Sequence, residues 1–166
     1  MILKGSKRGG AVDLGRHLLK TENEHVEIHE VRGFMADNVV DALMEAHAIS
    51  RGTKCSKFLF SLSLNPPETE NVPVGAFEDA IETIEAKLGL GGQPRVVIFH
   101  EKEGRRHAHC VWSRINADTM TAIDMPHFKL KLQDVARKLY LEHGWKMPGG
   151  LLDSALCNPL NFNRKE

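Results

Sequence analysis

Two β-prone runs lie close together in the second half of the chain. RVVIFH, residues 95–100, and HAHCVWSRI, residues 107–115, are rich in β-branched and aromatic residues, and each predicts a strand. Only the polar loop EKEGRR separates them, so the two strands are expected to pair as an antiparallel hairpin. Any fold of this chain must therefore contain an antiparallel sheet.

Three histidines gather on this predicted hairpin. Residues two apart in a strand share a face, so His107 and His109 point the same way. His100 ends the preceding strand, and the hairpin brings it beside this pair. Neutral imidazoles are good metal ligands, whereas three close histidines without a metal repel one another when protonated. The pattern predicts a metal site, although a chain with nine histidines also produces HxH by chance.

Apolar spacing and turn residues define the remaining elements. Strands are expected at residues 1–5, 25–34 and 57–64, and helices at 11–20, 38–50, 74–88 and 125–143, with Asp37 capping the second helix. The order is β-α-β-α-β-α-β-β-α, without strict βαβ alternation. It predicts an α+β fold, a central antiparallel sheet with helices packed mainly on one face. Residues 1–150 are expected to form one domain and residues 151–166 an irregular tail.

Composition narrows the class of protein. The chain has 166 residues, of which 42% are hydrophobic, enough for one domain with a core. Its three cysteines, widely spaced and without a CxxC motif, argue against a disulfide framework or a zinc ribbon. No apolar run reaches the roughly 18 residues that span a bilayer, and no secretory signal is visible, so the cytoplasm is the expected compartment.

Basic residues cluster in two places although the net charge is zero, with 22 basic and 22 acidic residues. This balance argues against a protein that simply coats nucleic acid, but it allows a local basic groove. Arginines beside a divalent ion suit a phosphate better than a carbonyl. The candidate DNA-binding residues are Lys4, Lys7 and Arg8 near the N-terminus and Arg105, Arg106 and Arg114 around the histidines.

The spacing HxxExxxHxH, formed by His100, Glu103, His107 and His109, resembles the metal motif of the HUH endonucleases, and more narrowly of the MobA/VirD2-like plasmid mobilisation relaxases. KFLFSLSLNPP resembles the middle strand motif of that family. The resemblance implies a relaxase, a metal-dependent, site- and strand-specific DNA nickase that cuts single-stranded DNA at a transfer origin. Such an enzyme stays attached to the 5′ phosphate and later rejoins the ends.

The same resemblance implies roles for individual residues. The three histidines would hold Mn²⁺ or Mg²⁺, with Zn²⁺ as an alternative, and Glu103 would be an extra ligand or a base. Where most relaxases carry an N-terminal tyrosine nucleophile, this chain has His17 in GRHLLK. One relaxase branch with the same metal spacing uses histidine and forms a phosphoramidate, which makes His17 the expected nucleophile. Origin DNA and accessory relaxosome proteins would be the partners in conjugative mobilisation.

Three alternatives stay open at this stage. Tyr140, the only tyrosine, follows the HxH strand on a predicted helix, which is the order in rolling-circle replication initiators, although a packing role is expected for it. A degenerate His17 would leave a metal-containing DNA-binding module that does not cut. A small metallohydrolase or cupin-like protein would need a deep apolar pocket and no basic groove.

Overall fold

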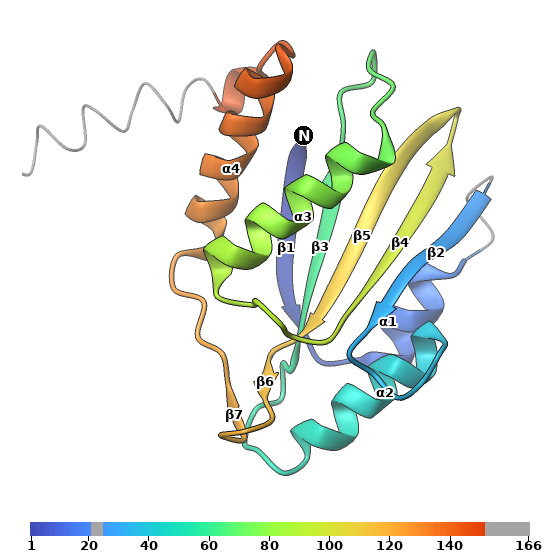
Figure 1. Ribbon diagram of the computed structural model, residues 1–166, viewed down its shortest axis with the longest axis vertical. Helices are drawn as coiled ribbons and strands as arrows, with labels where there is room; N and C mark the ends of the chain where they lie inside the picture. Colours follow the sequence, from blue (N-terminus) through green and yellow to red (C-terminus); the bar gives the residue numbers. More distant parts are fainter. Residues whose placement is uncertain (21–24, 152–166) are drawn as a thin grey trace, which may run out of the picture.

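A computed structural model describes residues 1–20 and 25–151 (Figure 1). The strands are β1 (Ile2–Arg8), β2 (His25–Arg32), β3 (Leu59–Asn65), β4 (Arg95–Lys102), β5 (Arg105–Ser113), β6 (Ile115–Asn116) and β7 (Thr121–Ala122). The helices are α1 (Ala11–Leu18), α2 (Val39–Ser50), α3 (Val74–Leu88) and α4 (Phe128–His143). The first five strands form one antiparallel sheet in the order β1-β3-β5-β4-β2, and β6 pairs with β7. The predicted α+β class is confirmed.

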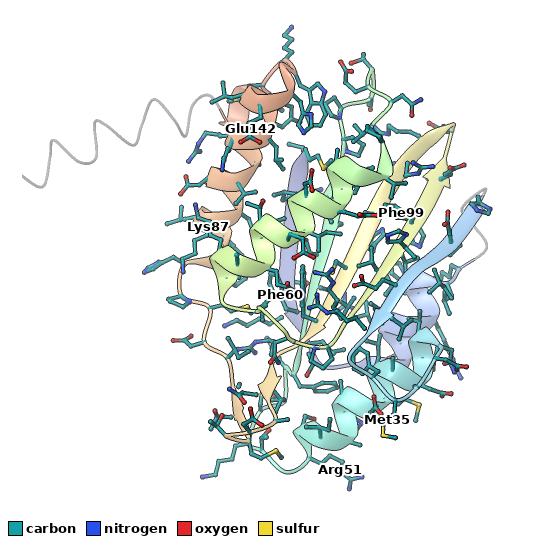
Figure 2. The ribbon with its side chains drawn as sticks, in the orientation of Figure 1. Met35, Arg51, Phe60, Lys87, Phe99 and Glu142 are labelled. Carbon is teal, nitrogen blue, oxygen red and sulfur yellow. The ribbon has the colours of Figure 1, made fainter. Side chains whose placement is uncertain are left out.

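Helices cover both faces of the sheet, so the prediction that they lie mainly on one face was wrong. Phe60, Phe99 and Trp112 pack against α3 and α4, while Val96 and Val111 pack against α1 and α2. In Figure 1, α3 crosses in front of the sheet and α4 lies beside β1, and Figure 2 labels Phe60 and Phe99. The interior strand β4 is apolar at consecutive positions, so both of its faces need a covering layer.

The predicted hairpin of β4 and β5 is present and tighter than expected. The two strands extend into the polar loop until Lys102 pairs with Arg105. The turn consists of Glu103 and Gly104, which both have positive φ angles, 54° and 73°. Two-residue hairpin turns of this primed kind match the twist of the flanking strands. The longer hairpin fixes the register that pairs His100 with His107.

Several element boundaries differ from the predicted ones. Asn38, not Asp37, caps α2, and its side-chain oxygen accepts from the backbone N–H of Asp41. Strand β1 continues to Arg8, and the short strands β6 and β7 have no sequence period to reveal them. Of the predicted tail, residues 152–166 lie outside the described residues. In the part of the chain that is described, no helix is long and apolar enough to cross a membrane.

A buried ionic cluster holds α3 against the sheet. The Glu85 carboxylate accepts from Trp112 Nε1 at 2.8 Å and Arg95 Nη1 at 3.1 Å, and Arg32 Nη2 lies 2.5 Å from it. Glu85 and Arg95 are 5% and 6% exposed. Trp112 therefore points away from the histidines, as its strand position predicts, and its indole N–H has a buried acceptor.

Candidate active site

The three histidines lie on the sheet face that α1 and α2 partly cover. His100 on β4 pairs with His107 on β5, and the rings of His100 and His109 are 4.5 Å apart between centroids. Their strand neighbours Ile98 and Val111, at even spacing, belong to the core under α1 and α2. The predicted convergence of the three imidazoles from two adjacent strands is therefore present.

Polar side chains of β3 continue the histidine surface across the sheet. Ser63 pairs with His109 on one side and with Lys4 of β1 on the other, so these residues form a row across three strands. Ser61 and Asn65 lie two residues to either side of Ser63, on the same face. We did not single out these residues from the sequence, although the alternation in FLFSLSLN marked a strand with one polar face.

Hydrogen bonds set the tautomers of two histidines. His107 Nδ1 lies 2.8 Å from Asn65 Oδ1, and Asn65 Nδ2 donates to Ser63 Oγ at 3.3 Å. His100 Nε2 lies 2.5 Å from the carbonyl oxygen of Leu18 at the end of α1. Because both partners are acceptors, these two ring nitrogens carry the protons. The lone pairs therefore sit on Nε2 of His107 and Nδ1 of His100.

Burial keeps the histidines uncharged. It lowers the pKa of His109 to about 4, and repulsion from His100 and His107 adds to the effect. Burial is also the largest cause of the lowered pKa values of His100 and His107. For His107, repulsion from the neighbouring Arg105 lowers the pKa further. All three imidazoles are therefore neutral near pH 7, the form that binds metal.

The donor chemistry of the three histidines fits a divalent metal ion. Neutral imidazoles whose other ring N–H is held by an oxygen are typical metal ligands. In the described residues, however, no group of three or more His, Cys, Asp or Glu side chains is arranged to hold an ion. Glu103, the predicted fourth member, occupies the exposed tip of the hairpin. The structure thus gathers the histidines without closing a metal cage.

His17 lies in the same cleft as His109. This cleft, of about 250 Å³, is lined by Lys4, Gly5, Ser6, Arg8, Leu14, His17, Leu18, Ser61, Ser63 and His109. Leu14 and Leu18 anchor α1 in the core, while the intervening His17 is exposed. Gly15 lets α1 approach α2, because a Cβ there would lie 3.1 Å from Val40 Cγ2. Helix packing therefore brings His17 to a histidine more than ninety positions away in the sequence.

The other predicted DNA-binding residues divide between the two faces. Lys4 and Arg8 line the cleft, whereas the Lys7 ammonium lies 5.7 Å from the centre of the Phe128 ring on the opposite face. Arg105 shares the strand face of His107, within 3.9 Å of Glu68, while Arg106 lies over Phe99.

Two further residues from the sequence analysis are buried in structural positions. Arg114 is 7% exposed, and its guanidinium donates to the carbonyl oxygens of Lys57 and Ile123 at 2.6 and 3.0 Å. Tyr140 is 3% exposed and packs edge-on against Trp145 at the end of α4. Helix α4 covers the sheet face opposite the histidines, so Tyr140 does not line the cleft.

The structure therefore combines an antiparallel sheet, three histidines on one of its faces and a basic cleft beside them. The family model described as "Relaxase: MobA/VirD2-like, nuclease domain" matches residues 16–145, and the chain belongs to this family. No curated protein and no solved structure matches the chain. The matched region begins next to His17 and includes all three histidines of the hairpin. Membership of this family supports a DNA relaxase or nickase role in general terms.

Proposed function

We propose that this protein is a metal-dependent, site- and strand-specific nickase and strand transferase that uses His17 as its nucleophile. The observation that carries the proposal is that His17 and His109 line one cleft together with the basic residues Lys4 and Arg8. A phosphodiester in this cleft would meet a nucleophile, cations for its negative charge and the edge of the histidine group at the same time.

The proposed chemistry uses a ring nitrogen of His17 as the nucleophile. A lone pair on a ring nitrogen of His17 attacks phosphorus, and the bond between phosphorus and the 3′ oxygen breaks. The leaving oxygen takes up a proton and becomes a free 3′ hydroxyl, while the imidazole loses its ring proton. The product is a phosphoramidate to the 5′ phosphate, and attack by a 3′ hydroxyl on this bond reverses the step and rejoins the strand.

We assign the metal to His100, His107 and His109, with Mn²⁺ or Mg²⁺ as the expected ion and Zn²⁺ as an alternative. The ion would polarise the phosphodiester and stabilise charge on the leaving oxygen. Asn65 and the carbonyl of Leu18 hold His107 and His100 by their other ring nitrogens. We propose Glu103, at the tip of the hairpin, as a further metal ligand or as a base.

We assign the catalytic domain to residues 1–150. Its DNA contacts in the cleft are Lys4 and Arg8, and Arg105 extends the basic surface beside His107. The in vivo setting would be conjugative mobilisation in the cytoplasm, with accessory relaxosome proteins at the transfer origin. Lys7, Arg106 and Arg114 are left out of the DNA site because Phe128, Phe99 and buried carbonyls engage them on other parts of the molecule.

The test is a denaturing gel of the protein with Mn²⁺ and labelled single-stranded oligonucleotides drawn from its genomic neighbourhood. Wild type, His17→Ala and Tyr140→Phe are compared, with His143→Ala as a matched histidine control on exposed α4 surface. We expect a covalent adduct that disappears only with His17→Ala and is labile in acid, as phosphoramidates are. Loss only with Tyr140→Phe would point to initiator-like chemistry. A wild type that binds the oligonucleotides but forms no adduct would be a DNA-binding module.

A further inference from the structure

Two hollows lie beside the cleft, around the loop that joins α2 to β3. The first, of about 300 Å³, is lined by Gly9, His47, Ser50, Arg51, Thr53, Lys54, Cys55, Ser56 and Phe58. The second, of about 730 Å³, lies between the same loop and the β6–β7 pair and is lined by Arg51, Gly52, Thr53, Lys54, Cys55, Met120, Thr121 and Ala122. The two share four lining residues, Arg51, Thr53, Lys54 and Cys55, and therefore lie against the same loop.

The first hollow begins where the cleft that contains His17 ends, at the end of β1. Arg8 lines the cleft and the next residue, Gly9, lines the first hollow. A Cβ at Gly9 would lie only 2.5 Å from the backbone oxygen of Ser56, so the end of β1 packs directly on the loop. Because Gly9 has no side chain, nothing projects from this residue between Arg8 and the loop. A polymer that leaves the cleft at Arg8 can continue onto the loop surface.

The loop carries positive charge without compensation. Its sequence from residue 51 to residue 57, RGTKCSK, contains Arg51, Lys54 and Lys57 and no acidic residue. All three basic residues are exposed, and no acidic residue lines either hollow. Figure 2 shows Arg51 at the lower end of the molecule, beyond α2 and far from Lys87 on α3. The surface suits a polyanion.

An aromatic platform completes the first hollow. The imidazole of His47 stacks on the buried ring of Phe58, with 5.1 Å between centroids and 20° between ring planes. His47 itself is exposed, while Phe58 supports it from below. Flat rings beside cations are the usual means by which proteins hold unpaired bases, because every base has a face that can stack.

We propose that this surface, formed by Gly9, His47 and the loop segment 51–56, is a second subsite for single-stranded DNA. His47 stacks a base, Arg51 and Lys54 bind phosphates, and the larger hollow beside Met120 receives a further base. The subsite holds the part of the strand that flanks the scissile phosphate. This inference rests on the proposed function, since it takes the same strand that enters the cleft.

The test measures binding of fluorescein-labelled dT20 by fluorescence anisotropy, in EDTA, so that neither metal nor cleavage contributes. The double variant Arg51→Glu/Lys54→Glu is compared with Lys87→Glu/Lys138→Glu, which changes the charge equally on exposed positions of α3 and α4. We expect the loop variant to raise Kd at least tenfold and the control less than twofold. The slope of log K against log salt should also fall by about 1.4, the loss of two single-strand phosphate contacts.

His47 is tested separately. We expect His47→Ala to weaken dT20 binding about fivefold or more, the lower end of base stacking on an aromatic ring. His47→Tyr, which keeps a flat ring, should restore it. Neither variant should alter the affinity for a blunt duplex of the same length, whose bases cannot stack on the ring.

The outcomes separate this inference from the proposed function. If the loop variant binds dT20 with the same affinity as wild type or as the control variant, the subsite is overturned. An adduct at His17 would still uphold the nickase in that case. Loop-dependent binding without any adduct would uphold the subsite and remove the nickase. A wild type that binds no single-stranded DNA would overturn both.

Discussion

Nδ1 of His107 lies 2.8 Å from Oδ1 of Asn65, across the pairing of β5 with β3. The contact fixes the tautomer of His107 and turns its ring towards β3, so that Nε2 carries the lone pair. Asn65 is itself oriented, because its amide nitrogen donates to Ser63 Oγ. A strand that carries no histidine thus sets the chemical state of one member of the histidine group.

We predict that Asn65→Ala weakens Mn²⁺ binding by about 10- to 100-fold, the usual effect of removing a partner that orients a ligating histidine. Isothermal titration calorimetry of the purified protein measures it. Asn71→Ala, at an exposed position before α3, is the matched control and should leave affinity unchanged. Equal affinities for wild type and Asn65→Ala would show that the asparagine does not position a metal ligand.

The metal-free protein should lose stability as pH falls. Because the folded state lowers the pKa of His109 from 6.5 to about 4, the unfolded chain binds more protons between these values. The free energy of unfolding therefore rises with pH in this window. The contribution of His109 to it is lost as pH falls from 6.5 towards 4. The lowered pKa values of His100 and His107 act in the same direction.

Urea titrations at several pH values, with EDTA present, measure this dependence. We predict that His109→Gln removes about 1.4 kcal/mol per pH unit from the slope, the contribution of one proton. His143→Gln, on exposed surface, is the control and should keep the wild-type slope. If the free energy of unfolding of His109→Gln depends on pH as steeply as that of wild type, other groups take up the proton.

The buried carboxylate of Glu85 should matter far more for stability than its exposed neighbour Glu82. Glu85→Ala leaves the Trp112 indole N–H without its acceptor and removes the most buried carboxylate from Arg95, which keeps Glu30 and Glu82, and we expect a loss of about 3–5 kcal/mol. Glu82 binds the same Arg95 at 2.8 Å but its side chain is 58% exposed, so Glu82→Ala should cost at most about 1 kcal/mol. Urea unfolding compares the two, and similar losses would contradict the burial argument.

Lys4 and Lys7 provide a second matched pair, because they lie on opposite faces of β1. Lys4 lines the cleft, whereas Lys7 lies over Phe128. We predict that Lys4→Gln weakens binding of a dT8 oligonucleotide about fivefold and lowers the salt slope by about 0.7, one phosphate contact on a single strand. Lys7→Gln should change neither value. Equal effects of both substitutions would mean that DNA does not run through the cleft.

Local patterns were enough to predict the hairpin and the shared face of its histidines. Both depend on the two-residue period of a strand and on a short loop, which involve neighbouring positions only. The same locality explains the turn, where Gly104 accepts a positive φ at no cost and Glu103 adopts one beside it. The α+β class and the helix and strand order follow from the same kind of signal.

Contacts between distant segments decided the rest. Nothing near Asn65 in the sequence shows that it holds His107, and nothing near Arg114 shows that its charge is buried against Lys57 and Ile123. Likewise, the sequence places Lys4 and Lys7 in one basic cluster, but the alternation of β1 sends them to opposite faces. The helices occupy both faces because β4 is apolar on both.

The sequence by itself was enough to predict that three histidines share one face of the hairpin and that His17 falls on a short helix. It could do so because residue type and strand period are local properties. Only the tertiary structure decided that His17 and His109 line one cleft, since Leu14 and Leu18 must first dock α1 on the sheet. That docking is driven by apolar burial among residues far apart in the chain, which spacing along the sequence does not encode.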